Sequence, residues 1–153
     1  MRKNVTETRR RVIACGNPLM GNDGAGASVL HLLMELNPEI DAVDGGTGGL
    51  GLIPLMEGYD KIVIVDAMVG IGERAGDVRV FREPPPVRHG TLALHEVGVG
   101  EAVTIARELG LALDVVTIGI EVGRVEQYSP VLDPAVEDGV KAAYALVLHE
   151  LAE

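Results

Sequence analysis

The chain has 153 residues, of which 47 % are hydrophobic and only 3 % aromatic, so aliphatic side chains must build its core. This length suits one domain with a sizeable core. The formal net charge is −10 at neutral pH. Such a surplus of acids excludes nucleic-acid binding through phosphate contacts and suits a protein that meets a cation or a basic partner.

Charge and cysteine content also bear on domain organisation and location. Residues 1–11 hold five basic side chains and one acid, so we predict a frayed basic N-terminus there and a single α/β domain over residues 12–153. The only cysteine, Cys15, excludes an internal disulfide and a multi-cysteine zinc site. No signal-peptide apolar region precedes it and no run is long enough to cross a bilayer, so we expect a reducing cytoplasm.

The first motif is a glycine-rich turn at residues 16–26. An apolar run at residues 12–15 leads into it, and a helical pattern that stops at Asn37-Pro38 leads out of it. Strand, turn and helix in this order are the layout in which α/β proteins place their sites.

Individual residues disfavour three nucleotide-binding interpretations of this turn. A phosphate-binding loop requires Lys after Gly21, where Asn22 and Asp23 stand. A dinucleotide-binding fingerprint begins at Gly24 but lacks its third glycine, since Val29 occupies that position. A phospho-receiver domain needs a lysine after its fifth strand, and none of the three lysines is suitably placed.

A second glycine-rich segment follows a short strand predicted at residues 40–43. This segment is Asp44-Gly45-Gly46-Thr47-Gly48-Gly49. Four glycines in six residues indicate a loop whose backbone must closely approach another group. A short helix is expected at residues 50–56. Residues 61–67 then form an apolar run that contains Asp66 near its end, which predicts a parallel strand buried on both faces.

The second half of the chain repeats strands and helices. Residues 77–82 alternate polar and apolar, which predicts an edge strand of antiparallel direction. His95 opens a helical pattern whose inward positions include Leu109. A last buried strand is predicted at residues 113–120, and Asp133-Pro134 has the form of an N-cap and first helical position. The alternation predicts an α/β fold with a mainly parallel sheet covered on both faces.

Three acids and one histidine are the candidates for chemistry. Asp23, Asp44 and Asp66 follow the first three predicted strands, and His95 precedes a helix on the same side of the sheet. Two carboxylates and one imidazole suit a divalent transition metal and leave coordination positions open.

Each candidate also has a structural interpretation. Asp23 could serve only as a helix cap, and Asp44 could serve only to brace its glycine turn. Asp66 is harder to explain this way, because a carboxylate in a buried strand costs free energy unless it is paired or metal-bound. Glu121, which ends the last strand, is a further candidate. No serine-hydrolase elbow and no H-E-x-x-H zinc motif competes with this set.

Four motifs in this order resemble the NiFe-hydrogenase maturation endopeptidases. They are Gly16-Asn17-x-Leu19-x-x-Asn22-Asp23-Gly24-x-Gly26, Asp44-Gly45-Gly46-Thr47, Val65-Asp66-Ala67 and His95. The resemblance runs from about Val12 to the C-terminus. It implies a three-layer α/β/α sandwich around a five-stranded, mostly parallel sheet. It also implies removal of a short C-terminal peptide from the hydrogenase large-subunit precursor after nickel has been inserted.

The resemblance assigns roles to individual residues. The family's metal ligands fall on Asp23, Asp66 and His95, and the nickel they meet would be carried by the substrate. The loop tied to activity and substrate recognition falls on Asp44 and on Gly45, Gly46 and Thr47, with Asp44 as our candidate for the catalytic base. Many members carry a second acid where this chain has Asn22.

Two other functions stay open at this point. A non-catalytic nickel chaperone could use the same three ligands only to hold the metal. A nucleotide-binding α/β module is the third possibility, and neither composition nor spacing alone decides among the three.

Overall fold

The computed structural model describes residues 7–19, 21–84, 98–111, 114–123 and 131–153. One five-stranded sheet runs through these residues, with the spatial order β2-β1-β3-β5-β4. Its strands are β1 (Arg10–Ala14), β2 (Ala42–Asp44), β3 (Lys61–Met68), β4 (Val78–Phe81) and β5 (Asp114–Glu121). All neighbouring pairs are parallel except β4 with β5, which confirms the predicted antiparallel edge strand.

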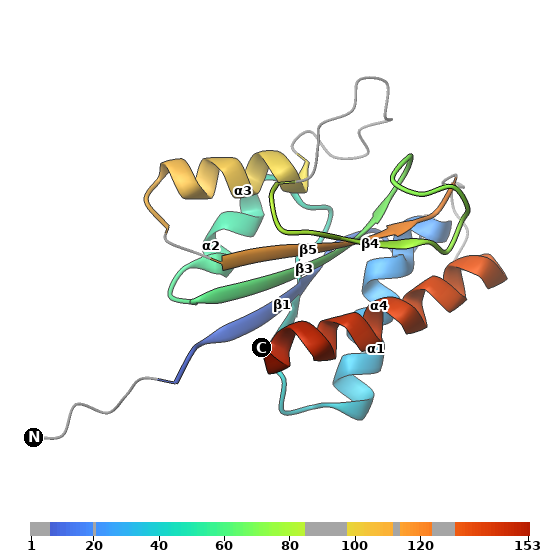
Figure 1. Ribbon diagram of the computed structural model, residues 1–153, viewed down its shortest axis with the longest axis horizontal. Helices are drawn as coiled ribbons and strands as arrows, with labels where there is room; N and C mark the ends of the chain where they lie inside the picture. Colours follow the sequence, from blue (N-terminus) through green and yellow to red (C-terminus); the bar gives the residue numbers. More distant parts are fainter. Residues whose placement is uncertain (1–6, 20, 85–97, 112–113, 124–130) are drawn as a thin grey trace, which may run out of the picture.

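Helices cover both faces of the sheet, so the predicted three-layer α/β/α sandwich is confirmed (Figure 1). The α-helices are α1 (Ala25–Leu36), α2 (Leu52–Met56), α3 (Val99–Glu108) and α4 (Pro134–Ala152). Two short 3₁₀ turns, η1 (Gly21–Gly24) and η2 (Gly49–Gly51), precede α1 and α2. The helices α1 and α4 pack on one face, and α2 and α3 pack on the other.

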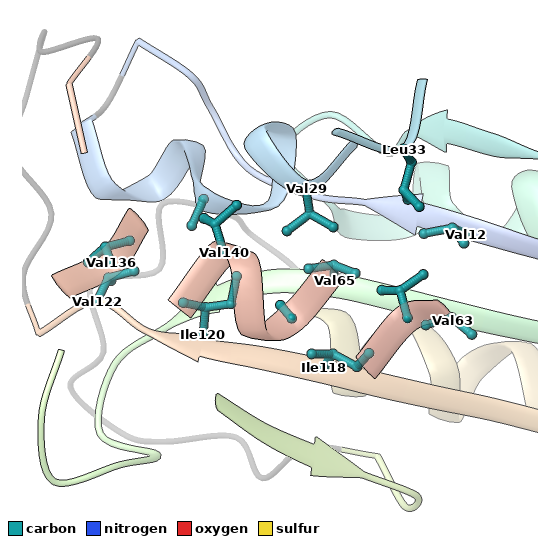
Figure 2. Packing of buried hydrophobic residues seen from close by; sticks show 13 residues of the cluster. Val12, Val29, Leu33, Val63, Val65, Ile118, Ile120, Val122, Val136 and Val140 are labelled. Atoms are coloured by element: carbon teal, nitrogen blue, oxygen red, sulfur yellow. The ribbon is translucent and has the colours of Figure 1, made fainter. Parts of the chain in front are cut away.

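The central strand β3 explains why its sequence is apolar without alternation. Successive side chains of a strand point to opposite faces. Val63 and Val65 therefore enter the core beneath α1 and α4, whereas Ile62 and Ile64 enter the core beneath α2 and α3. Figure 2 shows the first of these cores, with Val29 of α1 among the side chains that meet over the sheet.

One predicted core position is wrong. Leu109 is 68 % exposed, although the helical pattern placed it inward. The reason is that α3 ends at Glu108, and Gly110, with φ +89°, turns the chain away. Leu111 packs against the core in its place. His95, the predicted start of this helix, lies outside the described residues, and α3 begins at Val99.

The N-terminal residues 1–6 also lie outside the described part, so the frayed leader stays a prediction. The strand β1 begins at Arg10, slightly earlier than expected. The Arg11 guanidinium donates to Asp41 at 2.9 Å, and the Arg10 guanidinium donates to the carbonyl of Leu151. None of the described helices combines the length and hydropathy that crossing a bilayer requires.

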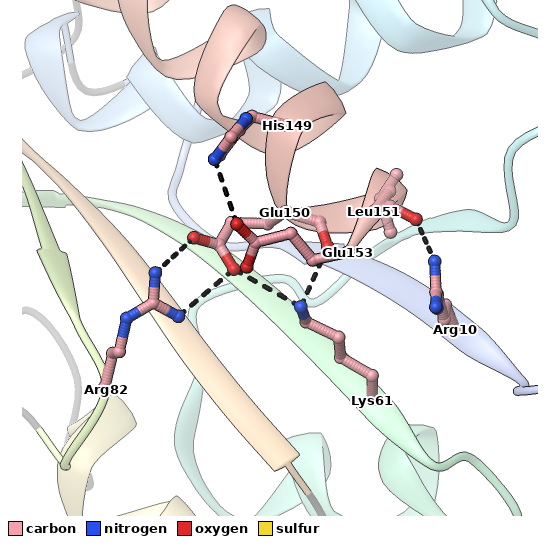
Figure 3. A network of polar contacts seen from close by, with 7 residues as sticks. All are labelled: Arg10, Lys61, Arg82, His149, Glu150, Leu151 and Glu153. Carbon is pink, nitrogen blue, oxygen red and sulfur yellow. Dashed lines mark hydrogen bonds and ion pairs between the residues drawn. The ribbon is translucent and has the colours of Figure 1, made fainter.

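A polar cluster joins the end of α4 to Lys61 at the start of β3 and to Arg82 just after β4 (Figure 3). Glu150 is only 1 % exposed and accepts hydrogen bonds from Arg82 at 2.7 Å and from Lys61 at 3.3 Å. The Lys61 ammonium also donates to the Glu150 main-chain carbonyl at 2.8 Å. The bonds to Arg82 and Lys61 hold the pKa of Glu150 below its usual value despite its burial.

Replacing Glu150 with Ala should destabilise the fold, because it leaves the buried Lys61 ammonium without its carboxylate. We expect the free energy of unfolding, measured by urea denaturation, to fall by about 3 kcal/mol. Glu153→Ala is the matched control, since this exposed acid pairs with the exposed His149. Similar small losses in both variants would show that the cluster does not anchor α4.

Candidate functional site

The parallel strands β1, β2 and β3 end at one edge of the sheet, which we call the carboxyl edge. Ala14 of β1 pairs with Asp44 of β2 on one side and with Val65 of β3 on the other. Asp66 therefore lies one residue beyond the level of Asp44, and η1 with Asp23 follows β1 directly. The structure brings the three predicted acids to one place, as the strand order required.

Asp23 organises the turn that follows β1. Its side chain is buried, with the residue 3 % exposed, and Oδ2 accepts a hydrogen bond from the Asn17 amide at 2.8 Å. Gly16 has φ +131°, and a Cβ there would lie 2.0 Å from the Asp23 carbonyl oxygen. The helix-cap alternative for Asp23 is wrong, because Gly24 occupies the N-cap of α1 and no side chain caps it.

Asn22 joins this turn to the start of α4. Its Nδ2 donates to the Asp133 carboxylate at 2.9 Å, and its Oδ1 accepts from the Asp133 amide at 2.9 Å. The N-cap predicted at Asp133 is correct in position, but the Asp133 side chain bonds Asn22 and no capping bond to α4 forms. An acid at position 22 would face the Asp133 carboxylate, so the amide at 22 and the acid at 133 form a matched pair.

Asp66 is the unusual member of the site. The residue is 8 % exposed, and its Oδ1 has no hydrogen-bond partner among the described residues. The pKa of Asp66 is raised to about 8, mainly by burial and further by the Asp23 carboxylate, and a backbone bond from Ala67 only partly offsets these two effects. A buried, unsatisfied carboxyl destabilises the fold, and such groups mark functional sites.

Asp44 lies at the exposed end of β2 and braces the second glycine-rich loop. Its Oδ1 accepts from the Gly46 amide at 2.6 Å, as the bracing alternative predicted. The Gly46 carbonyl in turn accepts from the Gly16 amide at 2.8 Å, so the two glycine-rich loops are joined. Apart from its chain neighbours, no atom of the described residues lies within 4 Å of the position that a Cβ at Gly46 would occupy.

Cys15 lies beneath these acids. Burial raises the pKa of its thiol well above the usual value, and Asp66, Asp44 and Asp23 raise it further in that order. The same three carboxylates therefore act on one buried sulfur, which agrees with their convergence. A thiol held neutral in this way is a packing group.

The third predicted ligand, His95, lies outside the described residues, so its place beside Asp23 and Asp66 stays a prediction. Within the described part of the chain, no three His, Cys, Asp or Glu side chains are arranged to hold a metal ion. Of the two histidines in that part, His31 is exposed on α1, and His149 is near the end of α4 and pairs with Glu153.

Glu121 has a role that its position in the sequence did not reveal. Its Oε1 accepts hydrogen bonds from three consecutive amides, those of Gly70, Ile71 and Gly72, at 2.7, 2.8 and 3.0 Å. Its Oε2 accepts from the Gly123 amide at 3.0 Å. This buried carboxylate fixes the loop that follows β3, and therefore the surroundings of Asp66. The only sequence signal for this role is that the apolar strand β5 ends in an acid.

The HycI family model, described as hydrogenase maturation protease, matches residues 27–150. The chain belongs to the hydrogenase maturation protease family. This membership confirms the resemblance found in the four motifs, and it makes the chain a hydrolase of peptide bonds. A nucleotide-binding module and a non-catalytic chaperone are not favoured.

Individual relatives agree with the family assignment. The hydrogenase expression/formation protein HupD of Rhodobacter capsulatus is 29 % identical over 92 % of this chain and 70 % of its own length. The hydrogenase 2 maturation peptidase from a Thaumarchaeota archaeon has a TM-score of 0.66 and 30 % identity, over 94 % of this chain and 98 % of that one. The maturation protease HycI from Thermococcus kodakarensis shares the fold, with a TM-score of 0.76 over 97 % and 96 % of the two chains and 20 % identity.

Replacing Asp66 with Asn should stabilise the fold, and the gain should grow with pH. The pKa of Asp66 is raised to about 8 from an ordinary value of 3.8, so the wild-type protein loses stability as pH rises through this window. Because Asn is neutral throughout, its advantage in the free energy of unfolding should rise from pH 5 to pH 8, by at most about 1.4 kcal/mol per pH unit. If urea denaturation gave the same difference in the free energy of unfolding between variant and wild type at every pH, the burial of an ionisable group here would be contradicted. The exposed Asp44→Asn is the control.

Replacing Glu121 with Gln should loosen one loop without unfolding the protein. An amide group cannot accept all four bonds, so we expect faster hydrogen exchange at the amides of residues 70–72. Asp77→Asn is the reciprocal control, because Asp77 accepts from the amides of Glu73 and Arg74 in the same loop. It should speed exchange at residues 73 and 74 alone. Uniform acceleration in both variants would mean that the loop opens as one unit.

Proposed function

We propose that this protease removes a C-terminal peptide from the nickel-loaded large-subunit precursor of a NiFe hydrogenase. The supporting observation is the buried Asp66 carboxyl, whose Oδ1 has no partner among the described residues, beside Asp23 at the carboxyl edge. A carboxyl group held in this way gains most from a cation that arrives with the substrate.

In this proposal Asp23, Asp66 and His95 are ligands for the nickel of the precursor. The carboxylates supply hard oxygen donors and the imidazole supplies a nitrogen, a set without thiolates that does not retain a soft or borderline metal tightly. Nickel therefore belongs to the substrate, and recognition depends on a completed nickel centre. The metal would polarise the scissile carbonyl or lower the pKa of a water.

The glycine-rich loop supplies the remaining roles. Asp44 is exposed at the end of β2, and its Oδ1 accepts from the Gly46 amide, a placement that suits a base. Gly45, Gly46 and Thr47 recognise the substrate. The open space around Gly46 leaves room for an extended segment of the precursor to lie against the loop. We place the reaction in the cytoplasm, in one domain spanning residues 12–153.

Asp23→Ala and Asp66→Ala should each abolish cleavage of the nickel-loaded precursor, because each removes a predicted ligand. In Asp23→Ala, loss of the hydrogen bond to the Asn17 amide alone should cost about 1 kcal/mol of stability. Asp138→Ala, an exposed acid on α4, is the control and should cleave normally. The product is measured by mass spectrometry, with and without nickel in the precursor. Equal processing of the nickel-free precursor would rule out nickel sensing.

A further inference from the structure

Exposed apolar side chains follow three neighbouring strands at the carboxyl edge. Leu50 follows β2, Leu19 follows β1 and Val69 follows β3, and their exposed fractions are 55, 65 and 38 %. Val131, 67 % exposed, lies two residues before Asp133, which bonds Asn22 in the turn after β1. We call these four side chains the apolar rim.

The backbone that presents the rim is held in place. The Leu19 amide donates to the Asn17 side chain at 2.9 Å, and Asn17 is itself bound by Asp23. Val69 directly precedes the three amides that Glu121 holds. These bonds hold the loops in a conformation that leaves apolar side chains partly exposed to water, and exposed apolar groups that lie together mark interaction surfaces.

The other large apolar side chains that are exposed lie elsewhere. Met34 and Leu36 lie in the last turn of α1, and Leu109 follows α3. Both helices end at the opposite edge of the sheet, on different faces, so these residues do not border the acids of the site. They provide matched controls of similar exposure.

The described loops of the carboxyl edge carry more exposed acids than bases. Among the described residues of the loops that leave β1, β2, β3 and β5 at the carboxyl edge, Arg74 is the only basic side chain, whereas Asp44, Glu73 and Asp77 are exposed acids. At the other edge bases and acids are paired: Arg11 bonds Asp41, Lys61 and Arg82 bond Glu150, and Arg107 bonds Glu83. An acidic face with apolar groups on it complements a partner that is apolar with basic surroundings.

We propose that the apolar rim docks an apolar, basic-flanked face of the folded precursor around its nickel centre. This inference rests on the proposed function and names the surface that selects its substrate. Asp23 and Asp66 are almost fully buried, so a substrate reaches them only with a projecting group while its surrounding surface meets the rim. Apolar contact at the rim then supplies affinity, and the acids supply orientation and rate of encounter.

The test compares charge insertions at the two edges. Leu19→Glu, Leu50→Glu and Val69→Glu place a charge in the rim, and Leu36→Glu and Leu109→Glu place one at the opposite edge. The Kd for immobilised nickel-loaded precursor is measured by interferometry, and KM and kcat are measured from product mass. For the rim variants we expect Kd and KM to rise by about tenfold or more, with kcat within about twofold of wild type. The two control variants should match wild type, and wild-type binding should weaken as sodium chloride is added.

Three results would overturn the inference. If the wild type cleaves the precursor and rim variants bind it as the controls do, the docking surface is wrong and the proposed function stands. If the wild type neither binds nor cleaves, the proposed function fails as well. If rim variants convert a dimer to a monomer in sedimentation without changing Kd, the rim contacts a second copy of this chain.

Discussion

The parallel pairing of β3 with β1 and β5 is the constraint on which the rest of the molecule depends. It aligns the ends of the strands, so that Asp66, Asp44 and the turn carrying Asp23 arrive at one edge. Because β3 is covered by helices on both faces, its carboxyl end leaves Asp66 in a poorly solvated place. The packing of the core therefore sets both the positions of the acids and the poor solvation of Asp66.

Acidic side chains at this edge divide into two kinds. Glu121 accepts hydrogen bonds from four described backbone amides, Asp23 accepts one from the Asn17 amide and Asp44 accepts one from the Gly46 amide, so these acids shape the loops around the site. Asp66 keeps one oxygen without a partner among the described residues, and its burial destabilises the protein. In the proposed function, a cation that arrives with the substrate offsets this cost, and substrate binding then depends on the presence of the metal.

The two edges of the sheet perform different tasks. At the edge opposite the carboxyl edge, Lys61 and Arg82 bond Glu150 and fix the end of α4. At the carboxyl edge, Asn22 and Asp133 fix its beginning. Helix α4 is thus fixed at both ends. The loops of the carboxyl edge present apolar and acidic groups to a protein substrate. Membership of the hydrogenase maturation protease family agrees with a surface organised for one large partner.

The sequence by itself determined the strands, most of the helices and the places of Asp23, Asp44 and Asp66, because periodicity and turn residues are local signals. It also determined the family, since four short motifs kept their order. Tertiary structure alone decided that Leu109 is exposed, that Asn22 bonds Asp133 and that Glu121 holds a loop some fifty residues away. These outcomes depend on polar and apolar contacts between segments distant in the chain, and no local pattern encodes which partner a buried carboxylate or amide will meet.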